Sequence, residues 1–113
     1  MHHMTVTECR IPLGRMQDFV AQLQQWEHDA RESEAGPEFH GVYLLETDPS
    51  RALVITQFTS REAAEAFNAS GMPERFRERV MASTGIRPNE VEGFDLFYAI
   101  LADGSRVVFG EDG

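Results

Sequence analysis

The segment Leu53-Val54-Ile55-Thr56-Gln57-Phe58-Thr59-Ser60-Arg61-Glu62-Ala63 changes from a strand pattern to a helix pattern within a few residues. Its first half is rich in β-branched and aromatic side chains, which favour strands. Thr59 and Glu62 then have the spacing of a capping box, in which the threonine hydroxyl accepts from the amide of Glu62 and the glutamate reaches back to the amide of Thr59. We therefore predict a strand that leads directly into a helix near Thr59.

The same order of strand, helix and strand is found twice along the chain. The first copy comprises Thr5–Ile11, a helix through Phe19 and Trp26, and Phe39–Glu46. The second comprises Leu53–Thr59, a helix through Phe67 and Phe76, and Glu90–Leu101. This doubling predicts an α+β, ferredoxin-like fold built from a split βαβ repeat, with a four-stranded antiparallel sheet and two helices on one face. The other face of the sheet then needs a cover that one chain does not supply.

Two local signals modify the second copy. Glycine is a poor residue inside a helix and proline suits a first helical turn, so the second helix should break and restart near Ser70–Pro73. After the last strand, Asp103-Gly104 is a hairpin signal, and Arg106–Phe109 can return as a fifth strand. This C-terminal hairpin extension either pairs within the chain or reaches a partner.

Composition limits the classes of function. The chain has 113 residues, with 19 acidic and 10 basic side chains and a net charge of -9. This length fits one domain, which we place at residues 4–113, and we interpret residues 1–3 as a remnant of an expression tag. The negative charge repels nucleic acids and anionic membranes, and no apolar run is long enough to span a bilayer. The single cysteine, Cys9, cannot form an internal disulfide, so we expect a cytoplasmic protein.

Four short motifs resemble the antibiotic biosynthesis monooxygenase domains, which belong to the dimeric α+β barrel group. The motifs are Glu8–Ile11, the Gly-Pro-x-Phe turn at Gly36–Phe39, Leu53–Ala63 and Glu92–Phe97, and the resemblance covers about residues 5 to 101. It implies a homodimer in which the sheets of two subunits stack face to face, which also covers the open face. It further implies a small-molecule pocket inside each subunit, between sheet and helices.

That family includes cofactor-independent, quinone-forming oxygenases and haem-degrading enzymes. The haem degraders use an asparagine on the first strand, a tryptophan on the second helix and, further along, a histidine that binds iron. The matching positions here are Cys9, Phe67 and Arg77. Arginine keeps its proton and does not ligate iron. The resemblance therefore implies chemistry without haem, and we expect no cofactor and no metal.

Cys9 and Arg77 are the candidate catalytic residues. A strand cysteine is usually a small buried hydrophobe, and activating its thiol takes a nearby cation, for which Arg77 is the positional candidate. On an unbroken helix Arg77 turns away from Phe67, but the predicted break can realign it. Pointing inward, its guanidinium can stabilise a phenolate or enolate. The neighbouring Arg75 and Arg79 favour the alternative, a solvated basic face.

The candidate substrate-binding residues are Phe67, Trp26, Phe76, Met81 and His40. The helical spacing of the aromatic residues and Met81 is also typical of an ordinary core, whereas flat substrates need aromatic walls. His40 alternates with Phe39 along its strand and faces either the core or the dimer seam. In the core it is a candidate general base.

Two functions of different classes remain open. The first is a cofactor-independent monooxygenase that acts on a flat phenolic or quinone-like small molecule, with Arg77 positioning the reactive anion. The second is a non-enzymatic dimer that binds a small hydrophobic molecule or serves as an assembly partner. The lack of a committed base favours the second function.

Overall fold

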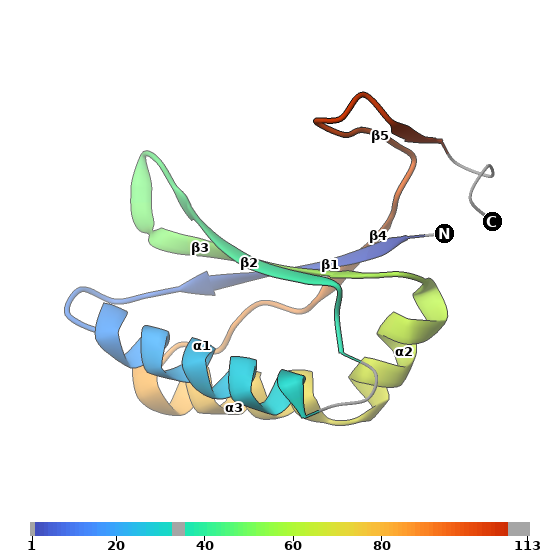
Figure 1. The fold of residues 1–113 in the computed structure, drawn as a ribbon. Coiled ribbons are helices and arrows are strands. Elements are labelled where there is room, and N and C mark those ends of the chain that lie inside the picture. The colour runs from blue at the N-terminus through green and yellow to red at the C-terminus, as the bar shows by residue number, and fades with distance from the viewer. Residues whose placement is uncertain (1, 33–35, 109–113) are drawn as a thin grey trace.

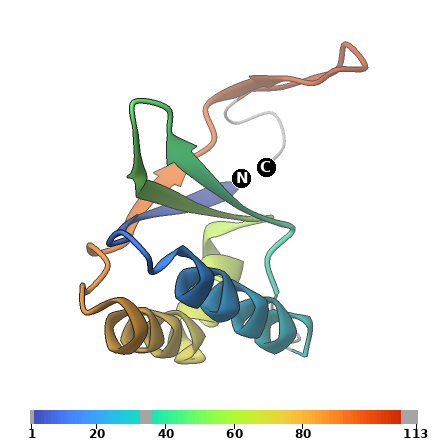
Figure 2. The ribbon, with the colours of Figure 1, turned by 90° about the vertical axis from the view of Figure 1, so that its left-hand side faces the viewer.

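The computed structural model describes residues 2–32 and 36–108, and its elements follow the doubled pattern (Figure 1). They are β1 (His3–Arg10), α1 (Met16–Arg31), β2 (Phe39–Leu45), β3 (Asp48–Phe58), α2 (Arg61–Ala69), α3 (Met72–Thr84), β4 (Glu92–Asp95), β5 (Tyr98–Ile100) and β6 (Arg106–Val108). Within these ranges, β2, β3, β1 and β4 form, in that order, a four-stranded antiparallel sheet. All three helices lie on one face of it (Figure 1 and Figure 2). The predicted α+β fold is confirmed.

The hydrophobic core fills the space between the sheet and the helices. It forms there because alternate residues of a strand point to the same face. The strands contribute Thr7, Cys9, Ala52, Val54, Thr56 and Phe58. The helices contribute Phe19, Trp26, Ala64, Phe67, Phe76 and Val80. Among the described residues, no helix is both long and apolar enough to cross a membrane.

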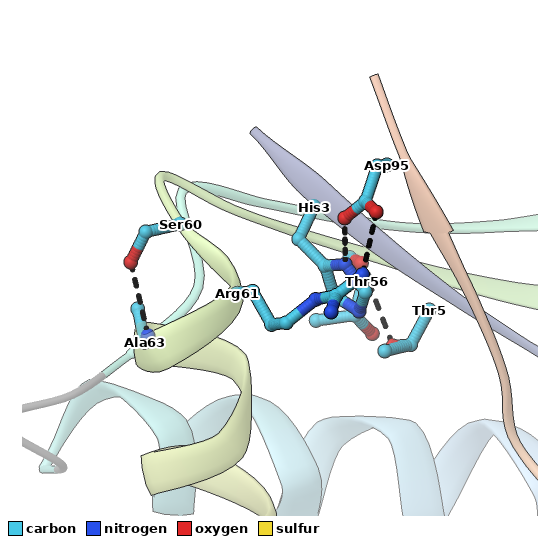
Figure 3. A network of polar contacts seen from close by, with 7 residues as sticks. All are labelled: His3, Thr5, Thr56, Ser60, Arg61, Ala63 and Asp95. Carbon is cyan, nitrogen blue, oxygen red and sulfur yellow. Dashed lines mark hydrogen bonds and ion pairs between the residues drawn. The ribbon is translucent and has the colours of Figure 1, made fainter. Parts of the chain in front are cut away.

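The start of α2 lies one residue later than the capping box predicts. Ser60, not Thr59, is the N-cap, and its hydroxyl accepts a hydrogen bond from the amide of Ala63 at 3.0 Å (Figure 3). Serine and threonine both cap helices well, so the sequence alone does not choose between them. β3 stays paired through Phe58, opposite His3, and Thr59 connects this last paired residue to the cap.

The predicted break in the second helix is confirmed. α2 ends at Ala69, and α3 begins at Met72, with Pro73 in its first turn. Gly71 lies between them with φ of +83°, a left-handed conformation that favours glycine. The chain therefore changes direction between the two helices.

The prediction of one long final strand over Glu90–Leu101 is wrong. β4 pairs only with the N-terminal half of β1, and its last residue, Asp95, lies opposite His3, where β1 begins. Beyond that point one further backbone hydrogen bond joins the two segments, from the Leu96 amide to the His2 carbonyl oxygen at 2.9 Å. β5 instead pairs with β6 in a separate two-stranded sheet that projects away from the main sheet (Figure 1 and Figure 2). Phe109, the predicted end of the return strand, lies outside the described residues.

A small cluster of charges ties β4 to its neighbours (Figure 3). Asp95 Oδ1 lies 2.9 Å from His3 Nδ1, and Asp95 Oδ2 accepts from Arg61 at 2.6 Å. The hydrogen bond with His3 and the nearby charge of Arg61 hold the pKa of Asp95 below its ordinary value. The carboxylate thus joins β4 to β1 and to the start of α2.

The sheet face opposite the helices is open and largely apolar. Across this face the strand pairing places Tyr43 beside Leu53, and Phe94 beside Met4. Tyr43, Leu53 and Phe94 are between 43% and 57% exposed. Such a surface is the kind that a partner covers, because exposed apolar area is costly in water.

Candidate functional site

A small cavity lies between the sheet and the helices, near the junction of α2 and α3. Aromatic side chains form much of its wall, namely Trp26, Phe58, Phe67 and Phe76. The polar residues that border it are Thr5, Thr7, Thr56, Asn68 and Arg77. Its volume is about 40 Å³. One buried water needs roughly 10–15 Å³, so the cavity has room for about three water molecules.

Phe67 and Arg77 meet at this cavity although they lie on different helices. Phe67 is near the end of α2, and Arg77 is in the middle of α3. The left-handed turn at Gly71 separates the two helices, so the angular offset expected for one continuous helix does not apply. The interhelix turn therefore brings together an aromatic ring and a cation.

Arg77 is turned inward, in contrast to the solvated basic face that its neighbours suggest. Its side chain is 15% exposed, and Nη1 lies 3.4 Å from Glu74. The buried Nε has no hydrogen-bond partner among the described residues. An unpaired buried donor costs free energy, and a ligand that accepts from this Nε would remove that cost.

His40 faces the helices rather than the open face of the sheet. Its ring stacks on Trp26 with centroids 3.7 Å apart and planes 15° from parallel. Nδ1 lies 3.1 Å from Oγ1 of Thr56, which borders the cavity. Burial lowers the pKa of His40 to about 4, so the imidazole is neutral at pH 7. His40 thus reaches the cavity through Thr56 rather than lining it.

Cys9 is part of the core and does not border the cavity. Its side chain is fully buried. Burial, assisted by the charge of Glu8, raises the pKa of the thiol to about 11, and the weaker opposing effect of Arg77 does not offset this. The thiol is protonated at pH 7, which works against a nucleophilic role.

The remaining predicted residues differ in their placement. Phe76 borders the cavity, and Phe67 packs against Trp26 and Phe58 with ring centroids 5.9 and 5.5 Å apart. Met81 is 47% exposed, so it is not part of the inward stripe of α3. That stripe continues from Val80 to Thr84 instead.

Sequence reasoning missed the threonines of the cavity, above all Thr56. A usable signal was present, because Thr56 alternates with Val54 and Phe58 on the inward face of β3. Among the described residues, no group of three His, Cys, Asp or Glu is placed to hold a metal ion.

Comparisons with known proteins agree with this architecture. The family model described as antibiotic biosynthesis monooxygenase matches residues 3–79. The match includes Cys9, Phe67 and Arg77 and ends before β4. A search of curated proteins finds no match.

Several solved structures share the fold. A protein from Bordetella bronchiseptica, described as a candidate antibiotic biosynthesis monooxygenase, has a TM-score of 0.66 and 14% identity, covering 84% of this chain and 96% of that chain. A protein of the same description from Caulobacter crescentus CB15 has a TM-score of 0.68 and 12% identity, covering 84% and 89%. A conserved protein from Methanosarcina mazei Go1 has a TM-score of 0.68 and 11% identity, covering 83% and 91%. At such identities the likeness shows the fold alone.

Proposed function

Because the chain belongs to the antibiotic biosynthesis monooxygenase family, we propose that it oxygenates a small phenolic or quinone-like molecule without a cofactor. The observation that supports this most is Arg77, an inward-turned cation at a cavity with aromatic walls. A phenolate or enolate reacts with dioxygen more readily than its neutral form. A guanidinium in poorly hydrated surroundings stabilises that anion.

The overall conversion is phenol plus dioxygen to quinone plus water. One oxygen atom enters the ring and the other leaves as water. The two hydrogens of that water come from the hydroxyl group and from the ring carbon that is oxygenated. Dioxygen is the oxidant, so the reaction requires no added reductant. The part of the protein is to hold the phenolate and to exclude solvent.

The size of the cavity limits how a substrate is bound. Pockets for small molecules usually have about 300–1,000 Å³, far more than the cavity between sheet and helices provides. A ring-sized substrate is therefore admitted only when side chains of the wall move. Trp26 is the single tryptophan of the chain and borders the cavity, so its fluorescence reports this change.

Oxygen uptake with a panel of phenols, from one ring to several fused rings, tests the proposal. The Arg77→Met variant should lose about 10- to 100-fold in kcat/KM, the range expected for a lost hydrogen bond to a charged group. Arg75→Met is the matched control, because Arg75 is an exposed arginine of the same helix. The proposal fails if no phenol in the panel supports uptake or if Arg77→Met is fully active.

A non-enzymatic binding function is the second candidate, and the lining of the cavity favours it. The polar residues that border the cavity are threonine, asparagine and arginine, none of which is a base at neutral pH. Saturable quenching of Trp26 fluorescence by phenols, without oxygen uptake, would support binding alone. Turnover with any phenol contradicts this second candidate.

We also propose that two copies of the chain associate through the open sheet face. The exposed apolar side chains Tyr43, Leu53 and Phe94 support this, because a second sheet would remove them from water. Sedimentation at micromolar concentration should give about twice the mass of one chain, which is 12.8 kDa. The mass of a single chain would contradict this proposal. If a dimer is found, Leu53→Glu should shift it toward the monomer, because it places a charge on the open face.

A further inference from the structure

Thr56 holds a hydroxyl at the cavity from the centre of the sheet. The residue is 7% exposed and borders the cavity. Across the sheet it lies between Thr5 on β1 and His40 on β2. The Thr5 hydroxyl donates to the Thr56 carbonyl oxygen at 3.5 Å (Figure 3). Among the described residues, the Thr56 hydroxyl itself has one side-chain contact, with His40 Nδ1 at 3.1 Å.

The surroundings of His40 indicate which ring nitrogen carries the hydrogen. Nε2 is buried and has no partner among the described residues. A buried N–H without an acceptor is more costly than a buried acceptor without a donor. The single hydrogen of the neutral ring is therefore best placed on Nδ1, where it is donated to Thr56 Oγ1. The charged residues Glu27, Arg31 and Glu38 border an outer groove beside the ring, but the lowered pKa of His40 has burial as its cause.

This arrangement leaves the hydrogen of the Thr56 hydroxyl unused. Its oxygen accepts from His40, so its own hydrogen is free to be donated into the cavity. Arg77 borders the same cavity and has an unpaired buried Nε. Thr56 and Arg77 thus border one cavity, and each carries a hydrogen that no acceptor among the described residues takes up.

We infer that the Thr56 hydroxyl and the Arg77 guanidinium form a two-donor site for the ionised oxygen of a phenol or enol, with His40 as the positioning residue. This inference shares one premise with the proposed function, namely that the small molecule binds at this cavity. A neutral phenol also has a hydrogen to donate, but arginine accepts none and the Thr56 oxygen already accepts from His40. The site therefore selects the ionised form, and the proton is released to solvent when the ligand binds.

Equilibrium binding of 4-nitrophenol under anaerobic conditions tests the inference without turnover. Its phenolate absorbs at a different wavelength from the neutral phenol, so absorbance gives the ionised fraction of the bound probe. Trp26 fluorescence gives its affinity. The matched neutral probe is 4-nitroanisole, which has nearly the same shape and does not ionise. We expect the phenolate to bind at least about tenfold more tightly than the anisole, the effect of one hydrogen bond to a charged group.

Variants separate the role of Thr56 as a donor to the ligand from that of His40 as the positioning residue. Thr56→Val keeps the shape and removes the hydroxyl, so it should weaken phenolate binding about tenfold and change anisole binding by less than about twofold. Thr56→Ser should retain the preference. His40→Phe keeps an aromatic ring against Trp26 but loses Nδ1, and it should reduce the preference several-fold. His40→Asn, which places an amide donor near the position of Nδ1, should restore it in part.

The outcomes distinguish this inference from the proposed function. Equal affinity for the phenolate and the anisole, or no binding of either probe, overturns the two-donor site. A wild-type preference in Thr56→Val also overturns it. A preference lost equally in Thr56→Val and Thr56→Ser overturns the role of the hydroxyl. Phenolate preference without oxygen uptake leaves the site standing and refutes only the oxygenase activity.

Discussion

Replacing Gly71 with alanine tests the turn that brings Phe67 and Arg77 to one cavity. In the structure Gly71 has φ of +83° and separates α2 from α3. Alanine in the left-handed region costs about 1–2 kcal/mol. A Cβ at this position would lie 3.0 Å from Arg75 Nη1, the end of a flexible side chain that can move away. The cost therefore comes from the backbone, and we expect Gly71→Ala to destabilise the protein by about 1–2 kcal/mol.

The sign of the change in unfolding free energy is decisive, because one continuous helix over α2 and α3 predicts the opposite sign. If α2 and α3 were one continuous helix, alanine would stabilise its interior by about 0.5–1 kcal/mol relative to glycine. Urea unfolding monitored by circular dichroism gives the change in free energy, and the m-value should stay constant. A decrease of 1–2 kcal/mol corresponds to a fall in Tm of about 4–8 °C for a domain near 100 residues.

Gly85→Ala is the matched control for this experiment. Gly85 ends α3 with φ of +80°, and a Cβ there meets nothing within 4 Å. A similar loss in both variants attributes the effect to the left-handed backbone. An unchanged or increased stability of Gly71→Ala, with a loss in Gly85→Ala, would refute the interhelix turn and with it the alignment of Phe67 and Arg77.

Three other predictions concern Cys9, His40 and Asp95. With its pKa raised to about 11, the Cys9 thiol should react with iodoacetamide at pH 8 about 100-fold more slowly in the native protein than in urea, and equal rates would contradict its burial. His40 has a pKa of about 4 in the folded protein, below its unfolded value. Between these two pKa values the unfolded state binds more protons than the folded state. The free energy of unfolding should therefore fall by about 1–3 kcal/mol as the pH drops from 6.5 to 4. His40→Leu should remove most of that dependence, and an unchanged pH profile in this variant would assign it to other groups. Asp95→Asn should speed amide hydrogen exchange in β4 while leaving the rest of the sheet protected, whereas unchanged exchange would show that the contacts with His3 and Arg61 do not hold this edge strand.

The elements of the fold were predictable because their signals are local. The usual behaviour of a strand cysteine predicted a small buried hydrophobe at Cys9, and its side chain is fully buried. The glycine and proline near residue 71 predicted the helix break for the same reason, since their backbone preferences act within one turn. The predicted cap was one residue off, because two good capping residues, Thr59 and Ser60, stand side by side.

The candidate site was predictable only in part. Phe67 and Arg77 were named as candidate site residues that the helix break can align, and the structure brings both to the cavity. Met81 was named with the inward residues, but it follows Phe76 by five positions, which turns it about 140° away around α3. Thr56 was not named, since a threonine on a strand carries no chemical signal until a histidine and a cation lie beside it.

Patterns within single elements determine the order of strands and helices and most of their buried positions, because alternation, caps and turns depend on neighbours in the chain. Contacts between distant segments set the inward direction of Arg77, the stacking of His40 on Trp26 and the end of β4. They depend on the length of β1, which lies beside β4, and on the side chains that fill the space between sheet and helices. A cavity is what that packing leaves open, so the cavity and the unpaired Nε of Arg77, which borders it, belong to the folded arrangement and to no segment alone.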